Sequence, residues 1–279
     1  MNSLQQSTPA CLHHLRIVSA NPDKLVKFYE RLLDLTAVPC AKSDDVVMTG
    51  PSRAIIVSPQ RGNNAPYYAY SVSDTLGLGR LAERLTASAV VFEPIDDPLF
   101  SGGAIVFSDP QGRRFVFGVG ARTEGQGGPA RLQHTVFQTT ELERVTRFFV
   151  DKIGFTISDE VVDAEGKVTV VFLRSDDEHH ALAFFRGSRN EWDHHCYETN
   201  DWNDIRDWGD RFAAAEVPIF FGPGRHGPGN NLFFMVNDPD GNCLEFSAEL
   251  LRVRADAEPG VWPQCERALN SWGRAWIRS

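Results

Sequence analysis

The sequence LHHLRI at positions 12–17 returns in altered form as LQHTVF at positions 132–137. In each copy an aromatic residue stands 14 positions after the last histidine, Phe28 after His14 and Phe148 after His134. Leu35 and Phe155 likewise stand 21 positions after these two histidines. A register kept over this length indicates an internal duplication, and it decides how the rest of the chain divides.

Each copy is predicted to begin with a strand, a turn and an amphipathic helix. Asn21-Pro22-Asp23 is typical of a helix start, and apolar residues then follow at helical spacing through Leu35. Near the end of each half, the sequences DPQG at 109–112 and DPDG at 238–241 indicate tight turns between two strands.

A second unit begins inside each half. Strand-like sequences start at Tyr67 and His194, and helical patterns follow at 78–85 and 202–212. We therefore expect an α+β protein of four βαβββ-type modules, paired into two domains at 1–120 and 131–279. The Gly-rich segment 121–131 is the expected linker.

The end of the chain is unusually aromatic. Trp262, Trp272 and Trp276 follow Glu258. So many large apolar side chains indicate a tail that packs on the body of the protein or on a partner subunit.

Composition narrows the class of partner. The 279 residues carry 28 Lys and Arg against 37 Asp and Glu, a formal charge of −9, which disfavours a nucleic-acid or polybasic membrane partner. The five cysteines are scattered without a Cys-x-x-Cys pair, and no signal peptide or 20-residue apolar run is present. We expect a cytoplasmic protein with a small-molecule ligand, no nucleic-acid or membrane partner, and a homo-oligomeric assembly.

A position-by-position comparison of the halves suggests a metal site. The second half offers His134, His194 and Glu245, where the first half has His14, Tyr67 and Val116. Two imidazoles and a carboxylate on three strands suit a site for Fe(II) or Mn(II) with open positions, so only the second half is expected to hold metal.

Only one of the neighbouring histidines His194 and His195 is expected to be a metal ligand. Adjacent strand residues face opposite sides of a sheet, so only one of them can point to the metal. The three-residue spacing from His194 to Tyr197 repeats that from His134 to Phe137, which favours His194. A one-residue bulge would favour His195 instead.

These motifs together resemble the vicinal oxygen chelate superfamily, and within it the type I extradiol ring-cleaving dioxygenases of the catechol 2,3-dioxygenase kind. The residues that carry the resemblance are LQHTVF at 132–137, DHHCYE at 193–198, GPGRHGPGNN at 222–231 and DPDGNCLEF at 238–246. It extends from about residue 12 to 249. It implies two tandem glyoxalase/bleomycin-resistance-type domains, each of paired modules forming an open barrel-like sheet, with Fe(II) in the C-terminal one. The implied reaction is cleavage of a catechol ring with O2.

The resemblance also implies two catalytic histidines. His180, 14 residues before His194, matches the family's acid–base histidine, and His226 matches a histidine beside the substrate oxygen or O2. A histidine suits acid–base work because its pKa lies near neutral pH. His179 is expected at the surface. Met235 replaces a tyrosine common in the family, and a thioether cannot donate that residue's hydrogen bond.

Apolar walls for the substrate are expected from five aromatic residues, Phe184, Trp192, Phe220, Phe221 and Phe233. Two alternative functions are considered. One is a metal-dependent isomerase or glyoxalase of the same superfamily that uses Mn, Zn or Ni as a Lewis acid. The other is a non-catalytic protein that binds a small molecule.

Overall fold

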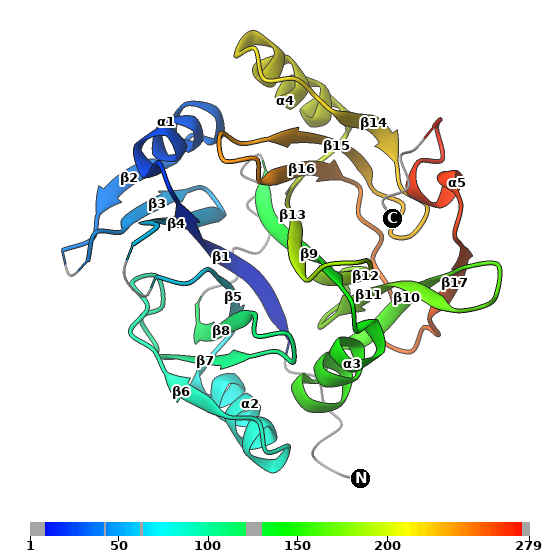
Figure 1. The fold of residues 1–279 in the computed structure, drawn as a ribbon, viewed down its shortest axis with the longest axis horizontal. Helices are drawn as coiled ribbons and strands as arrows, with labels where there is room; N and C mark the ends of the chain where they lie inside the picture. Colours follow the sequence, from blue (N-terminus) through cyan, green and yellow to red (C-terminus); the bar gives the residue numbers. More distant parts are fainter. Residues whose placement is uncertain (1–8, 42, 62–63, 121–129, 275–279) are drawn as a thin grey trace.

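The protein forms two β-sheets that lie side by side, with the helices on the outside (Figure 1). The computed structural model describes residues 9–41, 43–61, 64–120 and 130–274. Most of the expected linker, 121–129, lies outside these residues. The architecture is α+β, as predicted.

The first half forms an eight-stranded sheet in the order β2-β3-β4-β1-β5-β8-β7-β6. Its elements are β1 (Ala10–Ser19), α1 (Pro22–Leu33), β2 (Thr36–Pro39), β3 (Val46–Gly50), β4 (Arg53–Pro59), β5 (Tyr67–Val72), α2 (Thr75–Ala87), β6 (Phe92–Pro94), β7 (Ala104–Ser108) and β8 (Arg114–Val119).

The second half forms a nine-stranded sheet in the order β14-β15-β16-β13-β9-β12-β11-β10-β17. Its elements are β9 (Arg131–Thr139), α3 (Leu142–Arg147), the π-helix η2 (Phe148–Ile153), β10 (Thr156–Val162), β11 (Val168–Arg174), β12 (Leu182–Arg186), β13 (Glu191–Thr199), α4 (Trp202–Ala214), β14 (Phe221–Arg225), β15 (Leu232–Asn237), β16 (Cys243–Ala248), β17 (Gly260–Pro263) and α5 (Glu266–Leu269).

The four βαβββ modules are confirmed. In each module the first strand pairs in parallel with the last, as β1 does with β4 and β13 with β16. Two modules then join through their first strands, which run antiparallel in the pairs β1–β5 and β9–β13. The duplication in the sequence is therefore a duplication of paired modules.

Local sequence explains where the first helix begins. The side chain of Asn21 accepts a hydrogen bond from the backbone N–H of Lys24, and Pro22 occupies the first turn of α1. The helix in the equivalent position of the second half starts at Leu142 but passes into the π-helix η2, which the sequence pattern does not predict.

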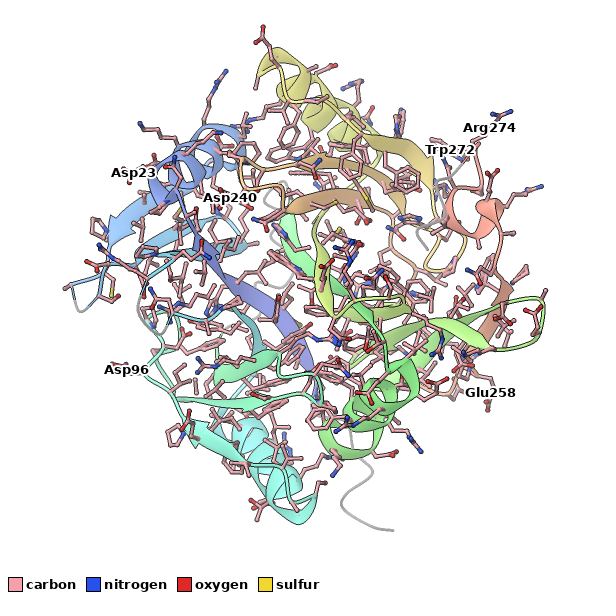
Figure 2. The ribbon with its side chains drawn as sticks, viewed as in Figure 1. Asp23, Asp96, Asp240, Glu258, Trp272 and Arg274 are labelled. Carbon is pink, nitrogen blue, oxygen red and sulfur yellow. The ribbon has the colours of Figure 1, made fainter. Side chains whose placement is uncertain are left out.

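The tail packs on the body of the protein, as one of the two expectations stated. β17 extends the second sheet by pairing in parallel with β10. Beyond α5, the ring of Trp272 lies 5.5 Å from that of Trp202 at the start of α4, and Figure 2 shows Trp272 near the end of β14. Trp276 lies outside the described residues.

The two halves contact each other along β1 and β9 (Figure 1). The Tyr70 hydroxyl donates to the Ala181 carbonyl at 3.1 Å, and the Tyr29 hydroxyl of α1 donates to Asp238 Oδ2 at 3.2 Å. Asp240 of the same β15–β16 turn lies near α1 in Figure 2. No helix among the described residues is long and apolar enough to cross a membrane.

One side of the first sheet is filled by side chains. Phe100, from the segment between β6 and β7, packs there with Tyr67, Ala104 and Val116. Phe100 lies so close to β8 that a Cβ on Gly118 would come within 2.2 Å of its ring. A glycine at 118 is therefore required by the packing of Phe100.

Gly118→Ala is expected to destabilise the protein by about 1–3 kcal/mol, because the added methyl group overpacks this cluster. Gly79→Ala, in the exposed interior of α2 with nothing within 4 Å of the new methyl group, is the matched control. It is expected to leave stability unchanged or raise it by up to about 1 kcal/mol. Denaturant unfolding checks both values, and equal stabilities of the two variants would contradict the packing argument.

Candidate metal centre

Strand register places three potential ligands in one row. The β9–β13 pair puts His134 opposite Cys196, and the β13–β16 pair puts Cys196 opposite Glu245. Ligand atoms of these three residues all lie within 4.8 Å of one another. His194, two positions along β13, brings its Nε2 to 3.2 Å from Glu245 Oε2. The structure thus brings all three predicted ligands together.

The equivalent row of the first half has no carboxylate. Register places His14 opposite Ala69 and Ala69 opposite Val116. Tyr67 stands where the second half has His194. His14 Nε2 lies 3.0 Å from Asp97 Oδ2, which also accepts a hydrogen bond from the Tyr67 hydroxyl at 2.6 Å. These polar groups satisfy one another, and Val116 offers no ligand atom.

His195 faces away from this row. Its ring lies 5.1 Å from the ring of Trp192, and its Nε2 is 3.5 Å from the Tyr29 hydroxyl of the first half. His195 is fully buried at that junction. Of the two neighbouring histidines, His194 is the one beside Glu245.

A neighbouring polar side chain contacts each predicted ligand at an atom that faces away from the other two ligands. His134 Nδ1 lies 2.5 Å from Gln133 Oε1, and His194 Nδ1 lies 2.6 Å from Asp193 Oδ1. Both partners accept a hydrogen bond from Nδ1–H, which leaves Nε2 of each ring as the ligand atom. Glu245 Oε1 accepts a hydrogen bond from Asn231 at 3.1 Å. Such outer partners are typical of metal ligands, so the donor set fits a metal ion.

The charges of the metal-free site follow from burial and from neighbouring groups. Burial lowers the pKa of His134 to about 3, so this ring is neutral. Burial also disfavours charge on His194, but the carboxylates of Asp193 and Glu245 outweigh it and raise its pKa to about 9. Burial opposes ionisation of Glu245 too, yet hydrogen bonds from His194 and His226 hold its pKa well below the usual range.

Cys196 is the residue of this row that sequence reasoning did not place among the ligands. Its Sγ lies 3.2 Å from Ser247 Oγ, and burial raises the pKa of the thiol well above its ordinary value. The thiol is therefore protonated in the metal-free protein. Its strand parity with His194 was the available signal.

A cavity of about 160 Å³ opens beside the row. Residues from every strand between β9 and β16 line it, so this part of the second sheet curls around it like an open barrel. The lining includes His134, Val136, Val161, Phe172, His180, Phe185, His194, Phe221, His226, Met235 and Glu245.

Both predicted catalytic histidines line this cavity. The ring of His180 lies 4.3 Å from that of His134, and burial holds its pKa well below the ordinary value, so it is neutral. His226 donates from Nδ1 to the Leu269 carbonyl at 2.6 Å and stacks on Phe233 at 3.8 Å. Its Nε2 lies 3.8 Å from Glu245 Oε2. His226 directly follows β14.

Two expectations were wrong. His179 is not at the surface: it is only 1% exposed and its Nε2 lies 3.0 Å from Asp159 Oδ2. Of the five aromatic residues expected as walls, only Phe221 lines the cavity. Phe184 packs in the main core, whereas its neighbour Phe185 faces the cavity, because successive strand residues face opposite sides.

Residues 131–246 match the family model for the Glyoxalase/Bleomycin resistance protein/Dioxygenase superfamily, and this part of the chain is a domain of that superfamily. Metapyrocatechase 2 of Cupriavidus necator is 27% identical over 223 residues, which cover 69% of this chain and 67% of the relative. The homoprotocatechuate 2,3-dioxygenase structure from Arthrobacter globiformis superposes with a TM-score of 0.82 at 19% identity, covering 98% of this chain and 90% of the other.

Two further relatives carry a metal in their names. The manganese-dependent 2,3-dihydroxybiphenyl 1,2-dioxygenase of Geobacillus genomosp. 3 is 23% identical over 283 residues, covering 91% of this chain and 90% of the relative. The iron-dependent extradiol dioxygenase of Rhodococcus jostii strain RHA1 is 25% identical over 250 residues, covering 80% and 81%. One of these two relatives is thus named for manganese and the other for iron.

Metal binding is expected to displace one proton from His194. Since the pKa of this ring is about 9 in the metal-free site, the Mn(II) association constant should rise about tenfold per pH unit below that value. His134 is already neutral and Glu245 already ionised, so neither releases a proton. Calorimetry in two buffers of different ionisation enthalpy measures the released proton.

His13→Gln, which alters a histidine of the first half, should show the same rise of the Mn(II) association constant with pH. A Mn(II) association constant that stays constant between about pH 6.5 and 8.5 would contradict the charges assigned to His194.

Gln133→Leu is expected to lower metal affinity about 10- to 100-fold, because His134 loses the partner that fixes its Nδ1 proton. Gln138→Leu, on the same strand and away from the site, is the control. Metal titration measures affinity, and thermal unfolding of the metal-free variants separates it from stability. Equal affinity in both variants would show that Gln133 does not orient His134.

Proposed function

We propose that this chain, whose residues 131–246 are a glyoxalase/bleomycin resistance protein/dioxygenase superfamily domain, is an extradiol dioxygenase that opens a catecholic ring with O2. The observation that carries the proposal is the convergence of His134, His194 and Glu245, each with an outer partner, beside an apolar cavity. The names of the relatives support the same activity.

The metal ligands in this proposal are His134, His194 and Glu245, and the metal is Fe(II) or Mn(II). A metal held by these three ligands would keep open coordination positions and would supply Lewis-acid and electron-transfer chemistry toward a catechol and O2. The protein itself supplies a neutral His134 and an anionic Glu245, so that the bound site has a low net charge.

His180 and His226 are proposed to act on the substrate. His180 is neutral and lies beside His134, so it can accept the proton of a catechol hydroxyl and return it later. His226 is fixed by the Leu269 carbonyl and by stacking on Phe233, which places its Nε2 3.8 Å from Glu245 Oε2 at the wall of the cavity.

The walls of the cavity indicate a substrate with an apolar substituent. Met235 stands at the position of the family's tyrosine, near Phe221 and Val136. Among the described lining residues, Arg186 is the cation other than histidine, and its guanidinium group contacts Glu143 and the Val168 carbonyl. A carboxylate on the ring would find no free positive partner there, and its desolvation would be uncompensated.

An oxygen electrode with Fe(II)-loaded protein tests the reaction and its substrate together. We expect O2 uptake with alkyl- or aryl-substituted catechols, and at least about tenfold higher kcat/KM for these than for 3,4-dihydroxyphenylacetate. A preference for the carboxylate-bearing catechol would contradict the substrate class. No uptake with any catechol would favour an isomerase or glyoxalase-type enzyme of the same superfamily.

His180→Gln is expected to lower kcat by about 10²–10⁴-fold, because general acid–base catalysis contributes that range, with metal content unchanged. His13→Gln serves as the control. Catalysis at the wild-type rate in His180→Gln would remove this residue from the mechanism. The third function considered, a binding protein, predicts that His134→Ala still binds the ligand without metal.

We also propose a cytoplasmic location and a homo-oligomeric assembly. The five cysteines are scattered through the sequence without a Cys-x-x-Cys pair, which agrees with a reducing compartment. The oligomer stays a prediction, which the mass of the purified protein in light scattering would test.

A further inference from the structure

Behind His180, on the side away from the cavity, lies a chain of polar side chains that the proposed reaction does not use. His180 Nδ1 is 2.9 Å from His179 Nδ1, and His179 Nε2 is 3.0 Å from Asp159 Oδ2. Both histidines are buried, at 3% and 1% exposure, and the Asp159 side chain is 13% exposed. This series of polar side chains therefore leads from the cavity almost to the surface.

The tail of the protein holds the outer end of this chain in place. Trp262 Nε1–H of β17 donates to Asp159 Oδ2 at 2.7 Å, and the Gly260 N–H donates to Asp159 Oδ1 at 3.0 Å. The approach at Gly260 is so close that a Cβ would come within 2.4 Å of Oδ1. Both carboxylate oxygens are thus fixed by β17.

His179 is fixed by its backbone as well. Its N–H donates to the Leu251 carbonyl at 2.9 Å, and its own carbonyl accepts a hydrogen bond from the Ser158 hydroxyl. These two hydrogen bonds fix the backbone from which the ring projects, and the ring itself is buried. Its position between Asp159 and His180 is therefore a property of the fold.

These contacts determine which ring nitrogens carry protons. A carboxylate accepts hydrogen bonds and donates none. Asp159 Oδ2 lies 3.0 Å from His179 Nε2, although off the ideal N–H axis. It would repel a lone pair on that nitrogen. His179 Nε2 therefore carries a proton, and in this Nε2–H tautomer Nδ1 has a lone pair. His180 must then donate from its own Nδ1, which leaves Nε2 without a proton.

We propose that Asp159 and His179 are positioning residues that select the tautomer of His180 in which its Nε2 lone pair is free to accept a substrate proton. Without the carboxylate, His179 could instead donate from Nδ1. His180 would then carry its proton on Nε2 and could not act as a base. β17 takes part in this selection because it fixes Asp159.

The tautomer can be observed without any reaction. In ¹⁵N-histidine-labelled, metal-free protein, long-range ¹⁵N–¹H correlation spectra distinguish Nδ1–H from Nε2–H rings. We expect His180 in the Nδ1–H form in the wild type and a gain of the Nε2–H form in Asp159→Asn. An Nε2–H form in the wild type would overturn the proposal.

Kinetics provides the second readout, which rests on the proposed function. Asp159→Asn should lower kcat about 10- to 100-fold with KM for the catechol and metal content unchanged, because a wrong tautomer impairs catalysis but not binding. Glu160→Gln, the same change of charge one position along β10, should retain wild-type kcat. An unchanged kcat in Asp159→Asn would overturn the proposal.

A second variant and the spectra distinguish an unfolded variant, a wrong tautomer proposal and a wrong proposed function. If Asp159→Asn does not fold, Trp262→Phe is the second variant, because it removes one hydrogen bond from the carboxylate. It should shift the tautomer of His180 and kcat in the same direction as Asp159→Asn, but by less. No shift in either would count against the proposal. If the wild type shows no dioxygenase activity, the proposed function fails, while the spectra still decide the tautomer.

Discussion

The buried carboxylate of Glu245 is the constraint on which the rest of the second half depends. Its side chain is almost fully buried, and an unpaired charge there would cost several kcal/mol. His194, His226 and Asn231 all turn toward it. These partners are themselves held by Asp193 and by the Leu269 carbonyl of the tail. One charge therefore organises residues from four separate segments of the chain.

The first half shows what the same architecture becomes without that charge. Val116 occupies the position of Glu245, and Phe100 fills the space beside it. His14 is satisfied by Asp97, which reaches it from the segment between β6 and β7. The half with valine in place of the glutamate thus has a packed apolar cluster, and it contacts the other half through pairs such as Tyr29 and Asp238.

Much of the fold and of the metal site could be predicted from the sequence, because the internal repeat can be recognised from the residues alone. Its register gave the four modules and the correspondence of His134 with His14 and of Glu245 with Val116, which the strand pairing confirms. The choice of His194 over His195 followed from its three-residue spacing to Tyr197, which repeats that from His134 to Phe137, and the structure places His194 beside Glu245.

The remainder depends on contacts between distant segments. His179 looks like a surface residue after three acidic positions, and only the return of the tail near Asp159 buries it. The prediction of the cavity walls was wrong because Phe184 and Phe185 differ only in which face of β12 they occupy, and the sequence alone does not show which face meets the cavity. The role of β17 in fixing Asp159 has no local sequence signal.

We propose that only the second half of this duplicated chain holds a metal, and that it holds one ion. The metal content per chain of anaerobically purified protein, compared with that of Glu245→Gln, tests this proposal. We expect one iron or manganese ion in the wild type and none in the variant. Two metal ions per chain, or a full complement retained by Glu245→Gln, would contradict it.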